Sequence, residues 1–298
     1  MAETVIAAHG LEKRFGELHA VRGIDLDVPS GICLGLLGPN GAGKTTTMRM
    51  IMGLTRPSAG RLTLFGRDVA ELPREQRRRI GLVPQEDNLD PDLSVTQNLQ
   101  VYGRYFGLPA AAIARRVPEL LAFMQLSEKA GARVMQLSGG MKRRLVIARS
   151  LIASPELIIL DEPTTGLDPQ ARVLIWRQLQ MLKAGGTTLL LTTHYMDEAQ
   201  RLCDRIVLID GGRILDQGSP EELIARHVKG HVVEVQKPLP AGVPDAIARE
   251  DIGHSVLFYV NLPAELIAHL PDDAVYLHRP ANLEDVFLRL TGRKLREN

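Results

Sequence analysis

The sequence has few cysteines, and this scarcity argues against a disulfide framework or a thiolate metal site. Its two cysteines, Cys33 and Cys203, are far apart in the sequence and lie inside apolar segments. This placement favours reduced side chains in a protein core.

The chain also lacks a long apolar run and a strong net charge. Nowhere do about 18 apolar residues run together, and the start Met-Ala-Glu-Thr-Val-Ile has neither a basic nor a hydrophobic signal region. We therefore expect a chain that neither is secreted nor spans a membrane by itself. With a formal net charge of only +1, the chain as a whole is not attracted electrostatically to nucleic acid or to an anionic membrane. The 298 residues, 45% of them apolar, suit one large domain with a smaller one.

A phosphate-binding motif lies near the N-terminus. Residues 38–46 fit the pattern GxxxxGK[ST] and comprise Gly38, Pro39, Asn40, Gly41, Ala42, Gly43, Lys44, Thr45 and Thr46. An apolar run that suits a buried strand, Ile32 to Leu37, precedes them, and Thr45 to Leu54 suits a helix. Glycines let successive N–H groups face one concavity at the positive end of that helix. We expect Lys44 to reach the outer phosphates of a nucleotide and the Thr45 hydroxyl to bind Mg²⁺.

Two acidic residues follow another buried strand. Leu157 to Leu160 is apolar, and Asp161 and Glu162 come directly after it. In open α/β sheets ligands lie at the carboxyl ends of the strands, which would place both carboxylates beside the phosphate loop. We expect Asp161 to hold Mg²⁺ through its water shell and Glu162 to act as general base on the attacking water.

The segments between these motifs predict an α/β fold with two domains. Short strands at Val5 to Phe15 and Ile24 to Val28 suggest an antiparallel edge sheet, and helical patterns fill residues 87–154. Strand, helix and strand then follow at Leu157 to Leu160, Pro169 to Lys183 and Thr188 to Thr193, which implies a parallel sheet. We expect a first domain at residues 1–220 and a small α+β domain at 221–298. In the second domain we expect strands at Val232 to Val235, Val256 to Val260 and Ala274 to His278, a turn or loose loop at Lys237 to Val243, and a capped helix at Asn282 to Leu290.

A second anion-binding helix start follows at Ser138. A serine N-cap precedes the bare N–H groups of Gly139 and Gly140. Leu137 to Met141 resembles the signature loop of ABC ATPases, although many of these have glutamine at the position of Met141. The resemblance implies a P-loop NTPase fold of the ABC cassette type, with a RecA-like parallel-sheet core, an N-terminal antiparallel β subdomain and a helical insertion. In this family two cassettes pack head to tail, so that the signature helix of one faces the γ-phosphate held by the other.

The resemblance also assigns residues that no local pattern singles out. It implies that Phe15 stacks on adenine, with a core phenylalanine as the alternative, and that Gln85 contacts Mg²⁺ and water. It further implies that Asp168 lies in the loop that crosses the dimer interface and that His194 senses the γ-phosphate. ATP and Mg²⁺ are the cofactors expected from it.

Three segments narrow the resemblance to the ATPase subunits of ABC-2 exporters, first those of the nodulation-factor, lipooligosaccharide type and next those of the daunorubicin-resistance type. They are Val83 to Asp90, Gly140 to Arg144, and Asn282 to Phe287 with Leu290 to Arg293. Such a subunit hydrolyses ATP to power export of an amphiphilic substrate. It works as a pair of copies bound to a separate transmembrane permease on the inner face of the cell membrane, with no nucleic acid partner. Tyr102, Tyr105 and Phe106 could line a groove for a permease helix or form a core. A non-transport ABC ATPase acting in translation or DNA repair is the alternative function.

Overall fold

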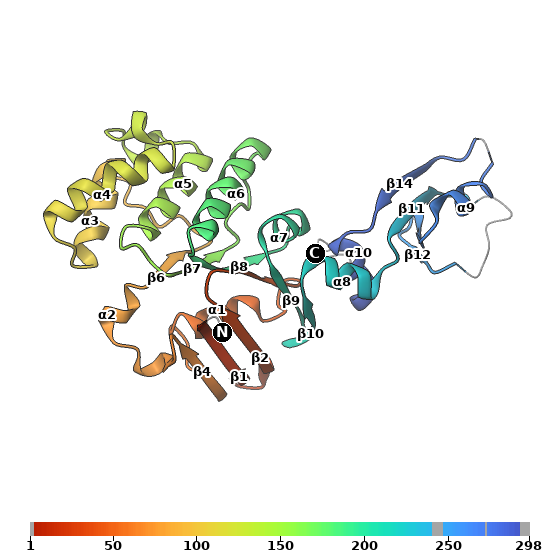
Figure 1. The fold of residues 1–298 in the computed structure, drawn as a ribbon, viewed down its shortest axis with the longest axis horizontal. Helices are drawn as coiled ribbons and strands as arrows, with labels where there is room; N and C mark the ends of the chain where they lie inside the picture. Colours follow the sequence, from red (N-terminus) through yellow and green to blue (C-terminus); the bar gives the residue numbers. More distant parts are fainter. Residues whose placement is uncertain (1–2, 240–246, 272, 293–298) are drawn as a thin grey trace. The chain divides into compact units, whose positions relative to one another are not determined.

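The computed structural model arranges its strands in three sheets (Figure 1). It describes residues 3–239, 247–271 and 273–292. The chain divides into two units, Met1–Leu215 and Asp216–Asn298. In the described ranges no helix is both long enough and apolar enough to cross a membrane.

A six-stranded sheet of order β10-β9-β3-β8-β7-β6 forms the centre of the first unit. Its strands are β3 (Cys33–Leu37), β6 (Ile80–Val83), β7 (Leu157–Asp161), β8 (Thr188–Thr193), β9 (Arg205–Asp210) and β10 (Arg213–Gly218). The pairs β6–β7, β7–β8, β3–β8 and β3–β9 are parallel, as the sequence predicts. Both β3 and β8 are buried along their whole length, as central strands of a parallel sheet covered on both faces are.

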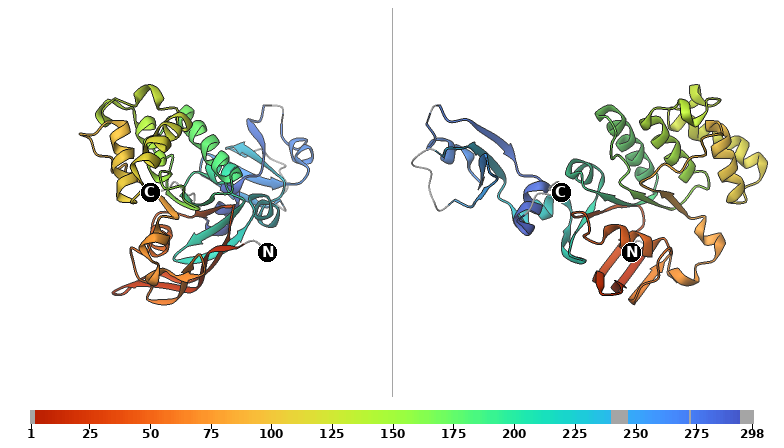
Figure 2. Two further views of the ribbon diagram at one scale, coloured as in Figure 1. Left: turned by 60° about the vertical axis from the view of Figure 1, so that its left-hand side comes forward. Right: turned by 180° about the vertical axis from the view of Figure 1, so that it is seen from behind.

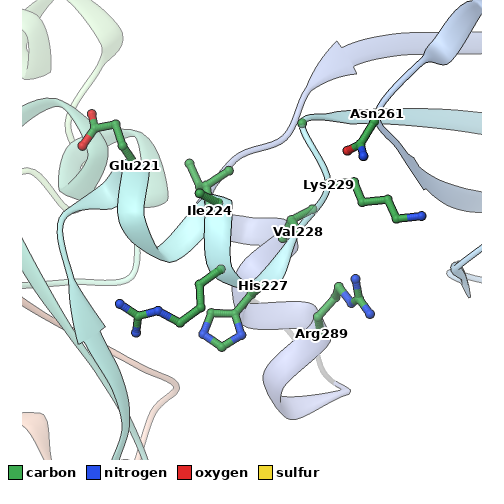
Figure 3. Close-up of a pocket in the computed structure, with 10 residues that line it drawn as sticks. Glu221, Ile224, His227, Val228, Lys229, Asn261 and Arg289 are labelled. Atoms are coloured by element: carbon green, nitrogen blue, oxygen red, sulfur yellow. The ribbon is translucent and has the colours of Figure 1, made fainter.

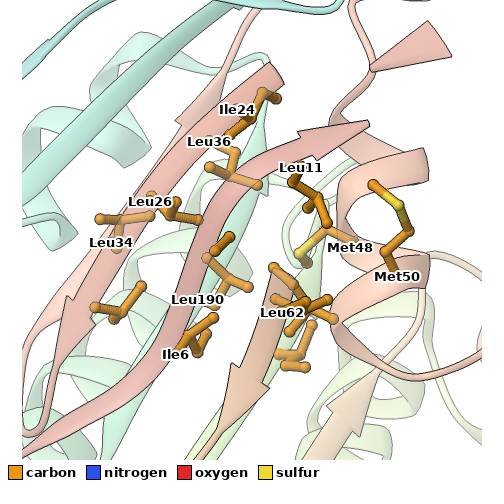
Figure 4. Close-up of a cluster of buried hydrophobic side chains, with 14 of the residues drawn as sticks. Ile6, Leu11, Ile24, Leu26, Leu34, Leu36, Met48, Met50, Leu62 and Leu190 are labelled. Atoms are coloured by element: carbon orange, nitrogen blue, oxygen red, sulfur yellow. The ribbon is translucent and has the colours of Figure 1, made fainter. Parts of the chain in front are cut away.

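The predicted antiparallel edge sheet packs against one side of this centre. Its order is β2-β1-β4-β5, and its strands are β1 (Thr4–Phe15), β2 (Leu18–Pro29), β4 (Ala59–Leu64) and β5 (Arg67–Asp68). Helix α1 (Lys44–Ile51) lies against it, followed by the short helix η1 (Val69–Glu71). Figure 4 shows the shared core, in which Ile6 and Leu26 of the antiparallel sheet meet Met48 of α1 and Leu190 of the central sheet. This packing fixes the phosphate loop, which joins β3 to α1.

Helices fill most of the segment between β6 and β7. They are α3 (Val95–Tyr105), α4 (Ala110–Phe123), η2 (Ser127–Lys129), η3 (Val134–Gln136) and α5 (Gly139–Ser150), after the short α2 (Arg74–Arg77) that precedes β6. Figures 1 and 2 show α3, α4 and α5 together, apart from the antiparallel sheet. Two further helices, α6 (Pro169–Ala184) and α7 (Met196–Leu202), flank β8 in the sequence. Asp168 caps α6, and Gly185 follows its last turn.

The second unit has a four-stranded sheet of order β12-β13-β11-β14. Its elements are α8 (Pro220–His227), β11 (His231–Gln236), β12 (Arg249–Asp251), β13 (Ser255–Val260), α9 (Pro263–Ile267), β14 (Tyr276–Pro280) and α10 (Leu283–Thr291). Val233, Phe258 and Leu266 belong to its core. The last strand begins two residues later than the sequence indicates, and residues 240–243 of the predicted loop lie outside the described residues.

The two cysteines are buried and free, as predicted. Their Sγ atoms lie 3.8 Å apart, although the residues are distant in the sequence. Cys33 begins β3 and Cys203 follows α7, so the pairing of β3 with β9 brings them together.

Candidate active site

Four loops that carry predicted site residues leave the central sheet at the same edge. The phosphate loop follows β3, Gln85 follows β6, Glu162 follows β7, and His194 follows β8. Because these strands are parallel and adjacent, their carboxyl ends bring the four loops together.

The phosphate loop is shaped by glycines in close contact with other backbone. A Cβ atom on Gly38 would lie 2.0 Å from the carbonyl oxygen of Ile209 at the end of β9. Gly43 caps α1 with a φ of 104°, in the left-handed region that favours glycine. The Gly212 N–H donates to the carbonyl of Ala42 from the turn between β9 and β10. This turn, which the sequence did not indicate as part of the site, supports the loop from behind.

Lys44 is buried within this loop and 6% exposed. Its Nζ donates to the carbonyl oxygens of Gly38 at 2.7 Å and Pro39 at 3.0 Å. Burial lowers the pKa of Lys44, while the charges of Glu162 and Asp161 act in the opposite direction. The ammonium group is therefore an ion whose only close oxygen partners among the described residues are neutral carbonyls, and an anion in the loop would compensate its charge.

Glu162 lies at the centre of a polar cluster. Its Oε1 is 3.2 Å from His194 Nδ1, and its Oε2 accepts from Thr165 Oγ1 at 3.1 Å and from Gln85 Nε2 at 3.4 Å. The hydrogen bond from His194 is the main cause that lowers the pKa of Glu162, against the opposing effect of burial. The carboxylate is consequently ionised near neutral pH and able to accept a proton.

The backbone at Glu162 is strained. This residue has a φ of 45°, which is uncommon for a residue other than glycine and which persists only where the surroundings hold it. From β8, the carbonyl of Thr192 accepts the Glu162 N–H at 3.1 Å, and the hydroxyl of Thr192 donates to Asp161. The side chain of this strained residue is the one that contacts Gln85 and His194.

Oxygen donors near the phosphate loop fit a magnesium ion. Mg²⁺ takes one or two protein ligands beside phosphate oxygens and water. Thr45 supplies an exposed hydroxyl directly after Lys44, Asp161 a half-buried carboxylate, and Gln85 an exposed amide. The described residues contain no group of three His, Cys, Asp or Glu that could hold a metal ion.

The other predicted residues lie outside this cluster. Ser138 caps α5 and accepts from the Met141 N–H at 3.3 Å, and no described hydrogen bond joins it to the phosphate loop. A Cβ atom added to Gly139 would meet no atom within 4 Å. Gly140 approaches Ala171 in the first turn of α6, whose cap is Asp168.

Phe15 ends β1 and is 50% exposed, with Lys13 Nζ 4.9 Å from its ring centre. A half-exposed ring argues against the alternative that this residue is part of the core. A half-exposed aromatic ring is the kind of surface on which a flat ligand can stack.

A second pocket, of about 750 Å³, lies within the second unit. Figure 3 shows that Lys229, Asn261 and Arg289 border it from three different segments. His227, which also lines it, contacts the carboxylate of Asp216. None of the predicted nucleotide ligands lines this pocket.

Comparison with known proteins identifies both parts of the chain. Residues 21–165 match the ABC transporter family, and residues 244–292 match the C-terminal domain of the nodulation factor export protein NodI. The chain is 53% identical to the Nod factor export ATP-binding protein I of Ralstonia nicotianae, covering 98% of this chain and 95% of that protein. It is 50% identical to the protein of the same name in Paraburkholderia xenovorans, with complete coverage of both.

Solved structures agree with this result. The ATP-binding subunit of an ABC transporter matches 74% of this chain and 92% of its own, with a TM-score of 0.68 and 30% identity. A dimeric ATP-binding cassette in a post-hydrolysis state, bound to ADP and Pi, matches 72% of this chain and 98% of its own, with a TM-score of 0.65 and 27% identity. The chain belongs to the ATP-binding subunits of ABC transporters, in the group that carries the NodI C-terminal domain.

Proposed function

We propose that this chain binds and hydrolyses ATP to power an ABC-2 type exporter whose cargo is an amphiphile of the lipooligosaccharide class. The observation that carries the catalytic part is the convergence of Gln85 and His194 on Glu162, beside the phosphate loop. The cargo class rests on relatives that are named for Nod factor export. The cassette by itself holds no evidence of cargo, because function follows from sites and not from folds.

Phosphate binding is the first step that the chain's residues can perform. Lys44 exchanges the carbonyls of Gly38 and Pro39 for the outer phosphates, which the positive end of α1 also favours. Phe15 stacks on the adenine, which its exposed ring permits. Thr45, Asp161 and Gln85 would hold Mg²⁺, which supplies charge neutralisation on the phosphate oxygens when bound.

Proton transfer is assigned to Glu162. Its carboxylate accepts a proton from the attacking water, while His194 and Gln85 fix the orientation of its two oxygens. His194 also reaches toward the γ-phosphate. A general base of this kind contributes about 10²–10⁴-fold to turnover.

A second copy of the chain completes the site. Ser138, Gly139 and Gly140 form the start of α5, which would contact the γ-phosphate held by the partner copy, and Asp168 would lie at the same interface. ATP therefore contacts two copies in the closed dimer and one in the open form. Binding shifts the population toward the closed dimer, and hydrolysis reverses the shift.

The permease contact is assigned to the helical segment. A groove of about 500 Å³ lies between the loop that follows Gln85 and helix α3, and Tyr102 and Tyr105 line it. Tyr105 is 71% exposed, which suits an aromatic side chain available to a partner helix. This contact would hold the subunit on the inner face of the cell membrane.

Copurification tests the transport assignment. Affinity purification from detergent-solubilised membranes is expected to retain a polytopic membrane protein, and the double variant Tyr102→Glu, Tyr105→Glu is expected to lose it while still hydrolysing ATP. Recovery of the wild-type chain on ribosomes or DNA instead, with no membrane protein, would favour the alternative of a translation or DNA-repair ATPase.

A further inference from the structure

Arg143 connects the signature helix to both loops that carry Gln85 and Glu162. It lies on α5, in the second turn after Ser138, and is 5% exposed. Its guanidinium donates to main-chain carbonyl oxygens on two separate loops. The acceptors are Pro163 at 2.7 Å, Asp161 at 3.0 Å, Glu162 at 3.1 Å, Gln85 at 3.3 Å and Pro84.

This arrangement uses the particular chemistry of arginine. The guanidinium is planar and carries five N–H donors in a fixed fork, whereas a lysine ammonium offers three donors at one point. A buried cation is costly unless it is fully hydrogen-bonded. The carbonyls supply these bonds, and Asp87 adds a carboxylate 3.9 Å away.

The acceptors include the strained peptide of the catalytic loop. Glu162, with its φ of 45°, is held through its N–H by Thr192 of β8 and through its carbonyl by Arg143. The loop after β6 is distant in the sequence from Glu162. Arg143 donates to the carbonyl of Gln85 in that loop and to the carbonyl of Glu162. The same side chain thus sets the position of one loop relative to the other.

We propose that Arg143 is a positioning residue for ATP hydrolysis, which fixes Gln85 and Glu162 relative to each other and ties both to the helix that begins at Ser138. The inference rests on the proposed role of Glu162 and extends it. Arg143 itself touches neither nucleotide nor water. Its loss displaces the reacting groups by a fraction of an ångström or more, and misplacement by about 1 Å can reduce turnover 100-fold.

The test compares Arg143→Lys and Arg143→Gln with the neighbouring variant Arg144→Lys. Arg144 is a matched control because it also donates to two carbonyls, those of Met124 and Gln125, which lie within the helical segment and far along the chain from both loops. Steady-state ATPase kinetics, binding of a fluorescent ATP analogue and thermal unfolding are measured for each. Arg143→Lys keeps the charge and provides the result if Arg143→Gln does not fold.

Both Arg143 variants are expected to lose about 10–100-fold in kcat, with the analogue's Kd within about threefold of wild type. Arg144→Lys is expected to keep kcat within about threefold. Since a merely structural role would reduce binding and turnover in parallel, a folded Arg143 variant with normal kcat, or with equal losses in binding and kcat, would overturn the proposal.

A double-mutant cycle distinguishes this proposal from the assignment of Glu162. If Arg143 acts through Glu162, the variant Arg143→Gln, Glu162→Gln is expected to turn over no more slowly than Glu162→Gln alone. If the reductions in turnover of the two single variants multiplied in the double variant, Arg143 would act independently of Glu162, which would contradict the proposal. Normal turnover of Glu162→Gln by itself contradicts the role of Glu162, whereas normal turnover of Arg143→Gln contradicts that of Arg143.

Discussion

His194 Nδ1 lies 3.2 Å from Glu162 Oε1, and the two residues come from the ends of neighbouring parallel strands. The contact lowers the pKa of Glu162 and leaves its second oxygen to Gln85 and Thr165. His194 is therefore placed to orient the carboxylate of Glu162. This pair links the phosphate site to the proposed base.

Replacement of His194 by alanine should reduce kcat by about 10–100-fold and leave ATP affinity nearly unchanged, because the variant loses an orienting group and no phosphate ligand of the loop. Steady-state kinetics with a binding titration would check this. His9→Ala is the control, since that imidazole is 60% exposed on β1. Wild-type turnover in His194→Ala would show that the contact with Glu162 has no part in catalysis.

Ser138→Arg should retain nucleotide binding and abolish ATP-driven dimerisation, because a long cation at the start of α5 blocks the approach of a partner's γ-phosphate. Light scattering with ATP would measure the dimer. The substitution also removes a helix cap, at a cost of about 1 kcal/mol. Ser219→Arg removes the cap of α8 in the same way and serves as the control. Equal dimer yield in Ser138→Arg and wild type would contradict the composite site.

Gly38→Ala should destabilise the chain by about 1–3 kcal/mol and weaken ATP binding, since the added Cβ would lie 2.0 Å from the Ile209 carbonyl and the backbone must move. Chemical denaturation and nucleotide titration would measure both effects. Gly131→Ala is the matched control, because its Cβ would meet no atom within 4 Å. Equal stability of the two variants would contradict the claim that β9 leaves no room for a side chain at Gly38.

Glu198→Gln should make stability less dependent on pH. Glu198 is fully buried, and its Oε1 accepts from Thr164 and Trp176. Burial raises the pKa of Glu198 above its ordinary value of 4.5, so the folded state favours the protonated form. Its stabilising contribution is present below pH 4.5 and is lost as the pH rises through the raised pKa.

Thermal unfolding at several pH values above 4.5 would therefore show wild type losing stability more steeply than Glu198→Gln, which keeps an acceptor for the same donors. Identical pH profiles of the two proteins would contradict a raised pKa of Glu198 in the folded state.

Much of the fold follows from local patterns in the sequence. The apolar run Leu157 to Leu160 indicates a buried strand, and Asp168 with Pro169 marks the start of α6. The phosphate loop was recognisable because its glycines and lysine are contiguous. Gln85 and His194, by contrast, were found through family resemblance, since a single glutamine or histidine after a strand carries no distinctive pattern.

Other features depend on tertiary contacts that no local pattern encodes. Arg143 was one basic residue in the run Lys142 to Arg144, and only the strand order shows which carbonyls it reaches. The contact between Cys33 and Cys203 likewise follows from β3 lying beside β9. The elements β12 and α9 were missed because three and five residues are too short for a periodic signal.

The most direct test of the account is the behaviour of Glu162→Gln with ATP, measured as turnover and as mass by light scattering. The amide keeps the size of the side chain and removes the proton acceptor. We predict that the variant binds ATP, accumulates as a dimer and hydrolyses ATP at least 100-fold more slowly than wild type, in line with loss of a general base. A monomer that hydrolyses ATP at the wild-type rate would contradict both the role of Glu162 and the site shared between two copies.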